Sequence, residues 1–258
     1  MTTPSSTHAP RVLIALPDID FDPTESAIPW LRMQEAGMEI TFATSTGGIA
    51  AADPLLISGV LFGKIRATEP ARATYAAMVA SHAFTHPVSY EAIQPGDFDA
   101  IVLPGGHAPG MKPYLESRLL QSRVQQAMAN GSIVGAICHG VLLLARVTDP
   151  ATGASMLRDR QVTALPKYME RAAWLGTAWK LGTYYRTYPT WVADEVRSGL
   201  AKQSQFTNGP GPWKPFALRD GNLVTSRWPK DSEHFASVMI EAIRERAGAT
   251  SSTPTSAR

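Results

Sequence analysis

The residue with the most reactive side chain in this sequence is its only cysteine, Cys138. An apolar, β-branched run (residues 133–137) precedes it, and His139, Gly140 and an apolar run (141–145) follow. This pattern predicts a strand, a sharp elbow and a helix, with the thiol at the corner. The first amides of such a helix can hold an oxyanion, and its dipole lowers the pKa of a thiol. A buried, inert cysteine is the alternative.

A carboxyl group is the second candidate. Glu25 comes just past the end of the first expected strand, which is where a parallel sheet places its ligands. Because Cys138 ends another strand, the two side chains can converge. A carboxyl beside a thiolate has a raised pKa, so a protonated Glu25 can donate a hydrogen bond to the sulfur and act as a general acid and base. The alternative is a glutamate that only complements the helix dipole.

A glycine pair and two histidines complete the candidate chemistry. Gly105, Gly106 and His107 follow a buried strand, and glycine permits the close approach that an oxyanion loop needs. An ordinary turn between a strand and a helix is the alternative. The N–H groups of Gly106 and His139 are the candidates for an oxyanion hole. The imidazole of His139 can also fold back towards the thiol of Cys138.

No metal or cofactor is expected. His82 and His86 are four residues apart and could share a helix face, a spacing compatible with metal ligation. The sequence places no third ligand beside them, so surface histidines are favoured. Neither a GxGxxG nor a P-loop pattern is present, which argues against a nucleotide cofactor.

The elements that must position these residues form an α/β pattern. The opening strand, loop, helix and strand predict a flavodoxin-like, doubly wound, mainly parallel sheet with helices on both faces and a small cap or insertion. The expected strands are Arg11–Leu16, Met38–Thr44, Ala100–Leu103, 133–137, Gln161–Leu165 and Leu223–Thr225. The clearest expected helices are Glu25–Gly37, Glu116–Ala129 and Ser232–Ala247.

The chain reads as one domain. Residues 1–10 and 248–258 are expected to be disordered, and 11–247 to form the domain. Within it, 46–95 and 167–215 are expected to leave the sheet as cap or interface excursions. The aromatic residues of the second excursion are typical of a buried cap or a dimer contact.

The composition narrows the class of protein. Among 258 residues, 44% are hydrophobic, 18% are charged and the formal net charge is +2, which describes a soluble globular protein. No cluster of lysine and arginine supports nucleic-acid binding, and no apolar segment reaches the ~20 residues of a membrane-spanning helix. A single cysteine excludes an intrachain disulfide, so a cytoplasmic protein is expected.

Taken together, these motifs resemble the ThiJ/PfpI superfamily, which has the class I glutamine amidotransferase-like fold. The likeness is greatest to the branch of heat-shock chaperones and glyoxalase III enzymes. The residues that carry it are 22–25 (DPTE), 99–107 (DAIVLPGGH) with Met111, and 136–140 (AICHG); 220–225 (DGNLVT) fits more loosely.

The resemblance implies roles for these residues. It implies a nucleophile at Cys138, a glutamate partner at Glu25, a histidine at His139 and an oxyanion hole from the amides of Gly106 and His139. It also implies a homodimer, no cofactor and a small carbonyl or amide substrate.

One departure concerns the acid that orients His139 in this branch. At the matching place the chain has Lys167, and Leu165 stands where a shorter branch has a histidine. The substitutes to consider are Asp194, Glu195 and Glu170.

The sequence therefore predicts a cysteine-dependent, cofactor-independent lyase or hydrolase for small carbonyl compounds, similar to glyoxalase III and deglycases. Two alternatives are a stress-response holdase chaperone or cysteine redox sensor, and a specialised amidase or hydratase. No nucleic-acid or membrane partner is expected.

Overall fold

The computed structural model describes residues 9–59 and 66–251. Seven strands form one sheet in the order β5-β3-β1-β6-β7-β9-β8. Of these, β8 runs antiparallel to β9 and the other neighbours are parallel. The predicted doubly wound, mainly parallel sheet is confirmed, and β3-β1-β6-β7-β9 has the flavodoxin-like order. The strands are β1 (Arg11–Ala15), β3 (Glu39–Thr44), β5 (Val88–Ser89), β6 (Ala100–Leu103), β7 (Ile133–Ile137), β8 (Ala217–Asp220) and β9 (Leu223–Ser226), and outside the sheet β2 (Ile19–Phe21) pairs with β4 (Ala51–Ala52).

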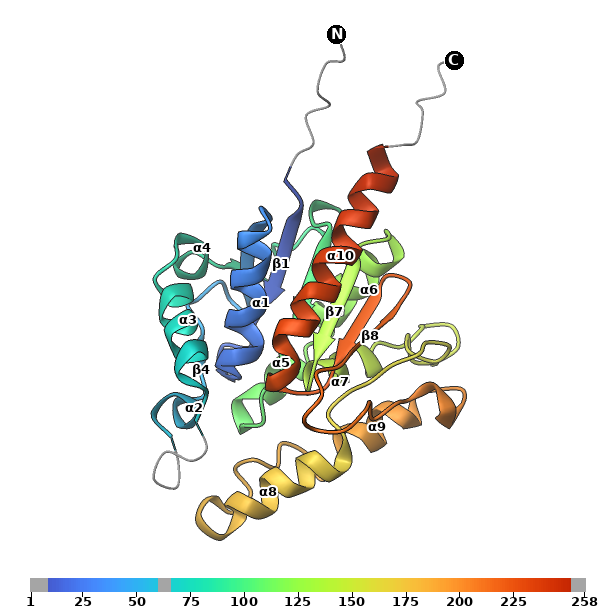
Figure 1. The fold of residues 1–258 in the computed structure, drawn as a ribbon. Coiled ribbons are helices and arrows are strands. Elements are labelled where there is room, and N and C mark those ends of the chain that lie inside the picture. Colours follow the sequence, from blue (N-terminus) through green and yellow to red (C-terminus); the bar gives the residue numbers. More distant parts are fainter. Residues whose placement is uncertain (1–8, 60–65, 252–258) are drawn as a thin grey trace, which may run out of the picture.

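Helices cover both faces of the sheet. In Figure 1, α1 and α10 lie in front of it, while α6 and α7 lie behind it. Within the described ranges, no helix is both long enough and apolar enough to cross a membrane. The helices are α1 (Pro23–Glu35), α2 (Pro54–Ser58), α3 (Glu69–Val79), α4 (His82–Thr85), α5 (Lys112–Leu115), α6 (Arg118–Ala129), α7 (Gly140–Ala145), α8 (Lys167–Leu181), α9 (Val192–Ser198) and α10 (Ser232–Ser251).

The strand order brings the candidate residues to one edge of the sheet. The chain passes from β1 to β3 on one side, and through β6, β7 and β9 on the other. The loops that follow the central strands therefore meet at the carboxyl edge, where such sheets bind ligands. Glu25 follows β1 and β2, Gly105 follows β6, and Cys138 follows β7.

The central strands are apolar on both sides because helices cover both faces. All residues of β6 and β7 are buried. Gly135 in β7 has no side chain where α10 crosses it, and a Cβ there would lie 2.9 Å from the ring of Phe235 and also meet Met239. The missing side chain lets α10 press against the strand that leads to Cys138.

The strand predicted at Gln161–Leu165 was wrong. Only an isolated bridge between Val162 and Phe206 occurs there. The neighbouring strand β9 already pairs with β7 on one side and β8 on the other, so it has no free backbone edge. The N–H of Thr163 instead donates to the side-chain oxygen of Thr225, 3.0 Å away.

The closing helix is longer than predicted. It continues to Ser251, four residues beyond the expected end at Ala247. Gly248 costs a helix about 1 kcal/mol relative to alanine, which does not end it, and the next proline is Pro254. The expected disorder of 248–258 is wrong for 248–251, which are helical, while residues 1–8 and 252–258 lie outside the described residues.

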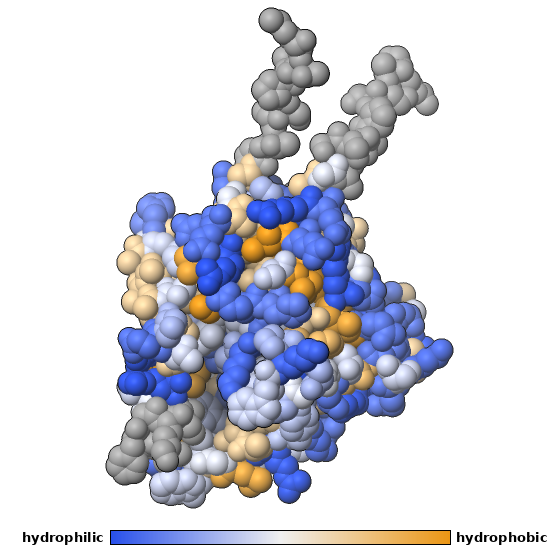
Figure 2. Space-filling model, viewed as in Figure 1, coloured by the Kyte–Doolittle hydropathy of each residue, from blue (hydrophilic) through white to orange (hydrophobic). Residues whose placement is uncertain are grey.

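The first predicted excursion does not leave the sheet entirely, because its strand β5 pairs with β3 at the edge of the sheet. The first contributes β4, α2, α3, α4 and β5 at one side of the sheet, and the second contributes α8 and α9 beyond its carboxyl edge (Figure 1). On α8, the aromatic residues Trp179 and Tyr168 are 73% and 48% exposed, and Leu175 is 54% exposed, so this part of the second excursion is not a buried cap. Figure 2 shows hydrophobic surface at this lower end of the molecule. A homodimer stays a prediction.

A buried ion pair holds the last part of the second excursion, which leads into β8. Arg227, at the end of β9, is fully buried and donates to both carboxylate oxygens of Asp231, at 2.8 and 3.0 Å. The same guanidinium donates to the carbonyls of Asn208, Gly211 and Lys214 at 2.8–3.1 Å. One charged group therefore satisfies several loop carbonyls that have no strand partners.

Replacing Asp231 with alanine is expected to lower the free energy of unfolding by about 3–5 kcal/mol, because it leaves the Arg227 charge buried and unpaired. Urea unfolding followed by circular dichroism measures this loss. The control is Glu245→Ala, which removes the 56%-exposed partner of Arg219 and should cost about 0–1 kcal/mol. Equal, small losses of unfolding free energy in both variants would contradict a stabilising role of the Arg227–Asp231 ion pair.

Candidate active site

Cys138 occupies the predicted elbow between β7 and α7. Its φ is +59°, a left-handed conformation that costs a non-glycine residue roughly 1–3 kcal/mol. Its N–H donates to the carbonyl of Ser226 at the end of β9, 3.1 Å away. The strand, elbow and helix are confirmed, and the strained residue is the one that carries the thiol.

Gly140 explains how the elbow can form. A Cβ at this position would meet the carbonyl oxygens of Leu103 and Pro104 at the end of β6, the latter at 2.9 Å. These are backbone atoms that cannot rotate away. The first residue of α7 must therefore be glycine for the chain to turn so tightly against the neighbouring strand.

Glu25 lies in the first turn of α1, and its side chain is fully buried. Asp22 caps this helix, since its Oδ1 accepts from the N–H groups of Thr24 at 2.7 Å and Glu25 at 3.1 Å. Pro23 occupies the first helical position, where a missing N–H costs nothing. The sequence DPTE thus starts the helix and places its carboxyl at a defined point.

Gly105 brings the acid and the thiol together. Its N–H donates to Glu25 Oε2 at 2.9 Å. A Cβ at Gly105 would lie 2.7 Å from that oxygen and 2.8 Å from Cys138 Cβ. The predicted convergence of Glu25 and Cys138 is therefore real, and a residue without a side chain separates them. Within the described residues, Glu25 Oε1 has no hydrogen-bond partner.

Two imidazoles face the thiol. Cys138 Sγ lies 3.6 Å from His139 Nδ1, so the predicted fold-back of this histidine occurs. It also lies 3.6 Å from His107 Nε2, and the two histidine rings are 4.8 Å apart. The sequence indicates His107 only as part of the glycine loop after β6. Its position directly after β6, beside the strand that ends at Cys138, was the available signal.

A carboxylate lies on the far side of His139. Glu170 Oε1 is 3.9 Å from His139 Nε2, and the carboxyl is 1% exposed. Its other oxygen accepts from the N–H of Val192 at 2.8 Å, and Arg186 lies 3.4 Å from Oε1. The guanidinium of Arg186 stacks on Trp191 at 3.4 Å. Glu170 is thus held near His139 without a direct hydrogen bond to it.

The other acids suggested as partners of His139 are paired elsewhere. Asp194 binds Lys167 at 2.6 Å, and Glu195 binds Arg146 at 2.6 Å. Lys167 begins α8 on an exposed side of the helix. Glu170 comes one helical turn later and points inwards.

Burial governs the ionisation of the thiol and its acid. It raises the pKa of Glu25 well above its usual value, and the nearby Asp22 raises it further. Burial also raises the pKa of Cys138, followed by the negative charge of Glu25. The His139 N–H at the start of α7 lowers the thiol pKa, in the predicted direction, but burial and the charge of Glu25 outweigh it. At most one member of this pair is ionised.

Burial keeps the imidazoles neutral. It lowers the pKa of His107 to about 4, and it lowers that of His139 well below its usual value, with the charges of His107 and Arg146 adding to the effect. Burial raises the pKa of Glu170 to about 7, against the Val192 N–H and Arg186. A neutral imidazole beside a protonated thiol can accept its proton.

The excursions close the site. The ring of Tyr185 meets that of His107 edge-on at 6.0 Å, and the hydroxyl of Thr187 donates to the His107 carbonyl at 2.6 Å. The hydroxyl of Tyr184 donates to Asp53 from the first excursion at 3.2 Å. Cys138 is therefore 0% exposed.

Of the two amides predicted to form an oxyanion hole, the structure gives a contact with the thiol for one, and the oxyanion hole itself stays a prediction. The N–H of His139 acts on the thiol of its neighbour. Gly106 packs closely, since a Cβ there would lie 2.6 Å from the carbonyl of Asp20 and 2.8 Å from Met111 Sδ. The role of the Gly106 amide stays a prediction.

The histidine pair at 82 and 86 does not form a metal centre with a third ligand in the part of the chain that the structure describes. Their rings stack at 4.2 Å on α4. The group of three metal-ligating side chains that the described residues do bring together is His107, Cys138 and His139, whose ligand atoms lie within 4.8 Å of one another.

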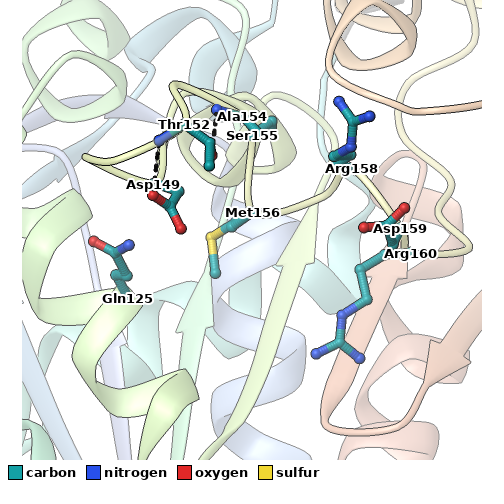
Figure 3. A pocket seen from close by; sticks show the side chains of 9 residues that line it. All are labelled: Gln125, Asp149, Thr152, Ala154, Ser155, Met156, Arg158, Asp159 and Arg160. Atoms are coloured by element: carbon teal, nitrogen blue, oxygen red, sulfur yellow. Dashed lines mark hydrogen bonds between the residues drawn. The ribbon is translucent and has the colours of Figure 1, made fainter.

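Two surface cavities lie apart from the thiol. Figure 3 shows one of about 450 Å³ at residues 149–160 and Gln125. Its Arg160 already donates to the carbonyl of Asp220 and to Asn222. The other, of about 500 Å³ and mostly apolar, lies beside Asp22 at the start of α1. Cys138 lines neither.

Comparisons with known proteins agree with this fold. A family profile described as ThiJ/PfpI family-like matches residues 16–210. An uncharacterized protein of Schizosaccharomyces pombe is 31% identical over 183 residues, 69% of this chain and 67% of that protein. The glutathione-independent glyoxalase HSP31 of Saccharomyces cerevisiae is 26% identical over 148 residues, 57% of this chain. The match spans about three fifths (59%) of the length of that glyoxalase.

A solved structure extends the likeness of the fold. Glyoxalase III from Candida albicans superposes with a TM-score of 0.69 at 21% identity, covering 90% of this chain and 97% of that one. At this level of identity the likeness concerns the fold alone.

Replacing Gly105 with alanine is expected to lower the free energy of unfolding by about 1–3 kcal/mol, because the new Cβ must displace Glu25 or Cys138. Urea unfolding measures the loss. The control is Gly96→Ala, where a Cβ meets nothing within 4 Å. A Gly105 variant as stable as the Gly96 variant would show that the three segments do not pack as closely as described.

Proposed function

This chain belongs to the ThiJ/PfpI family, and from that premise we propose that it is a cysteine-dependent enzyme that converts small 2-oxoaldehydes such as methylglyoxal into 2-hydroxy acids without a cofactor. The observation that carries the proposal is the Cys138 thiol, held 3.6 Å from a neutral His139 and beside the buried acid Glu25. The name of the yeast relative, a glutathione-independent glyoxalase, supports the same activity.

The chemistry balances without an external oxidant. The thiol adds to the aldehyde carbon and forms a hemithioacetal. A proton then leaves this carbon and another is delivered to the adjacent ketone carbon. The first carbon is thereby oxidised to a thioester and the second is reduced to an alcohol. Water cleaves the thioester, which releases the 2-hydroxy acid and restores the thiol.

Three buried groups, His139, Glu25 and Glu170, have roles in these steps. His139 accepts the thiol proton at Nδ1 as the carbon–sulfur bond forms. Glu25 lies beside the thiol with Oε1 unbonded, so it can carry the proton between the two substrate carbons. Glu170 faces Nε2 of His139, where its charge stabilises the imidazolium that forms.

The closed site favours small substrates. Cys138 and His139 are almost completely buried, and Tyr185 lies over His107. This burial favours a small aldehyde over a bulky substrate. The names of the relatives do not favour a chaperone, redox sensor, amidase or hydratase for this chain.

The Cys138→Ala variant is expected to lose at least about 1,000-fold in kcat/KM for methylglyoxal, because the bond-forming atom is gone. Lactate production measured by an enzymatic assay reports the turnover. Glu245→Ala is the control, since this residue pairs with Arg219 on the surface and should leave the rate unchanged. Undiminished turnover in Cys138→Ala, or a wild-type protein inert towards methylglyoxal and related aldehydes, would refute the proposed function.

The Glu170→Gln variant is expected to lower kcat by about 10- to 100-fold with little change in KM, because it removes a charge that stabilises the imidazolium only in the transition state. Steady-state kinetics separate the two constants. The matched control is Glu195→Gln, which removes a nearby acid that is paired with Arg146 and not with His139. Equal effects of the two changes would assign Glu170 a structural role only.

A further inference from the structure

The proposed chemistry uses one of the two imidazoles at the thiol. His139 serves as the base, whereas His107 has no part in the steps above. Yet His107 Nε2 lies as close to Cys138 Sγ as His139 Nδ1 does, at 3.6 Å. A thiol and two imidazole nitrogens so close together can act as metal ligands, in addition to the role of the thiol as a nucleophile.

We propose that Cys138, His107 and His139 form a binding site for a soft divalent cation such as Zn²⁺, and that the bound ion blocks the nucleophile. This site goes beyond the proposed reaction, which requires no metal.

The distances suit a tetrahedral ion. Zinc binds sulfur at ~2.3 Å and imidazole nitrogen at ~2.0–2.1 Å, so ligands at tetrahedral angles place sulfur and nitrogen about 3.5 Å apart. Both sulfur–nitrogen distances here are 3.6 Å. The two nitrogens lie within 4.8 Å of each other, whereas a tetrahedral site needs ~3.4 Å, so binding requires one imidazole to move towards the other.

The donor types select the class of ion. A thiolate and two neutral imidazoles favour zinc and related soft ions over magnesium and calcium, which prefer oxygen. Binding forms a metal–sulfur bond and releases the thiol proton to solvent, with no change of oxidation state. A water completes the coordination, and the unbonded Glu25 Oε1 is available to accept a hydrogen bond from it.

The surroundings resemble those of metal-binding histidines. Such a histidine usually presents its second nitrogen to a carboxylate or carbonyl oxygen, which orients the ring. Here His139 Nε2 faces Glu170 Oε1 at 3.9 Å. The backbone of His107 is held by the hydroxyl of Thr187, which donates to its carbonyl at 2.6 Å. The three ligands therefore come from two segments, the loop after β6 and the elbow after β7, and the second excursion holds both.

The test is titration of the reduced, full-length protein with Co²⁺, a spectroscopic substitute for Zn²⁺. One ion per chain should produce a thiolate-to-cobalt charge-transfer band and the visible bands of a tetrahedral ion, and Zn²⁺ should abolish both. The His107→Gln variant should bind more than about 100-fold more weakly, because even the loss of an outer partner of a ligand costs roughly 10- to 100-fold.

The other histidine pair provides a matched control. The double variant His82→Gln/His86→Gln removes two stacked histidines on α4 and should leave the band and the affinity unchanged. Thermal melting establishes that each variant is folded. If His107→Gln is unfolded, Cys138→Ser takes its place, and it should lose the charge-transfer band.

Absence of the band in the wild-type protein would overturn the inference, as would undiminished binding in the folded His107 or Cys138 variant. Loss of binding in the His82/His86 variant would also overturn it. Because the readout is a spectrum, the outcome is independent of turnover. A protein that shows the band but is inert towards methylglyoxal supports the metal site and refutes the proposed function.

Discussion

The close approach of three backbone segments at the carboxyl edge of the sheet is the constraint on which the site depends. Gly105 and Gly140 have no side chains where the end of β6, the start of α7 and the first turn of α1 meet. Only this spacing allows the carboxyl of Glu25 to lie beside the strained Cys138. The fold supplies the contact because a parallel sheet brings the ends of neighbouring strands together at its switch point.

Burial then determines the ionisation of the side chains in the site. The thiol, Glu25 and both histidines lie where charges are poorly solvated, so each group is shifted towards its neutral form. The positive end of a six-residue helix is too weak to reverse this. A reaction at this site must therefore transfer protons between neighbouring neutral groups, and a bound cation must displace the proton of the thiol.

The two excursions add further side chains to the site at the edge of the sheet. The second one carries Glu170 to the far side of His139 and lays Tyr185 over His107. The hydroxyl of Tyr184 joins it to Asp53 of the first. Tyr185 and Glu170 therefore belong to the same segment, so a movement of this segment that uncovers His107 also moves the carboxyl beside His139.

Sequence alone determined the doubly wound, mainly parallel sheet, the elbow at Cys138 and the approach of Glu25 to it, because these follow from apolar periodicity, helix caps and glycines that act locally or through a regular sheet. Tertiary structure decided the rest. The acid at Glu170, the contact with His107 and the raised pKa of the thiol arise from side chains far apart in the chain. Such contacts depend on how an irregular segment packs, and no period in the sequence records that.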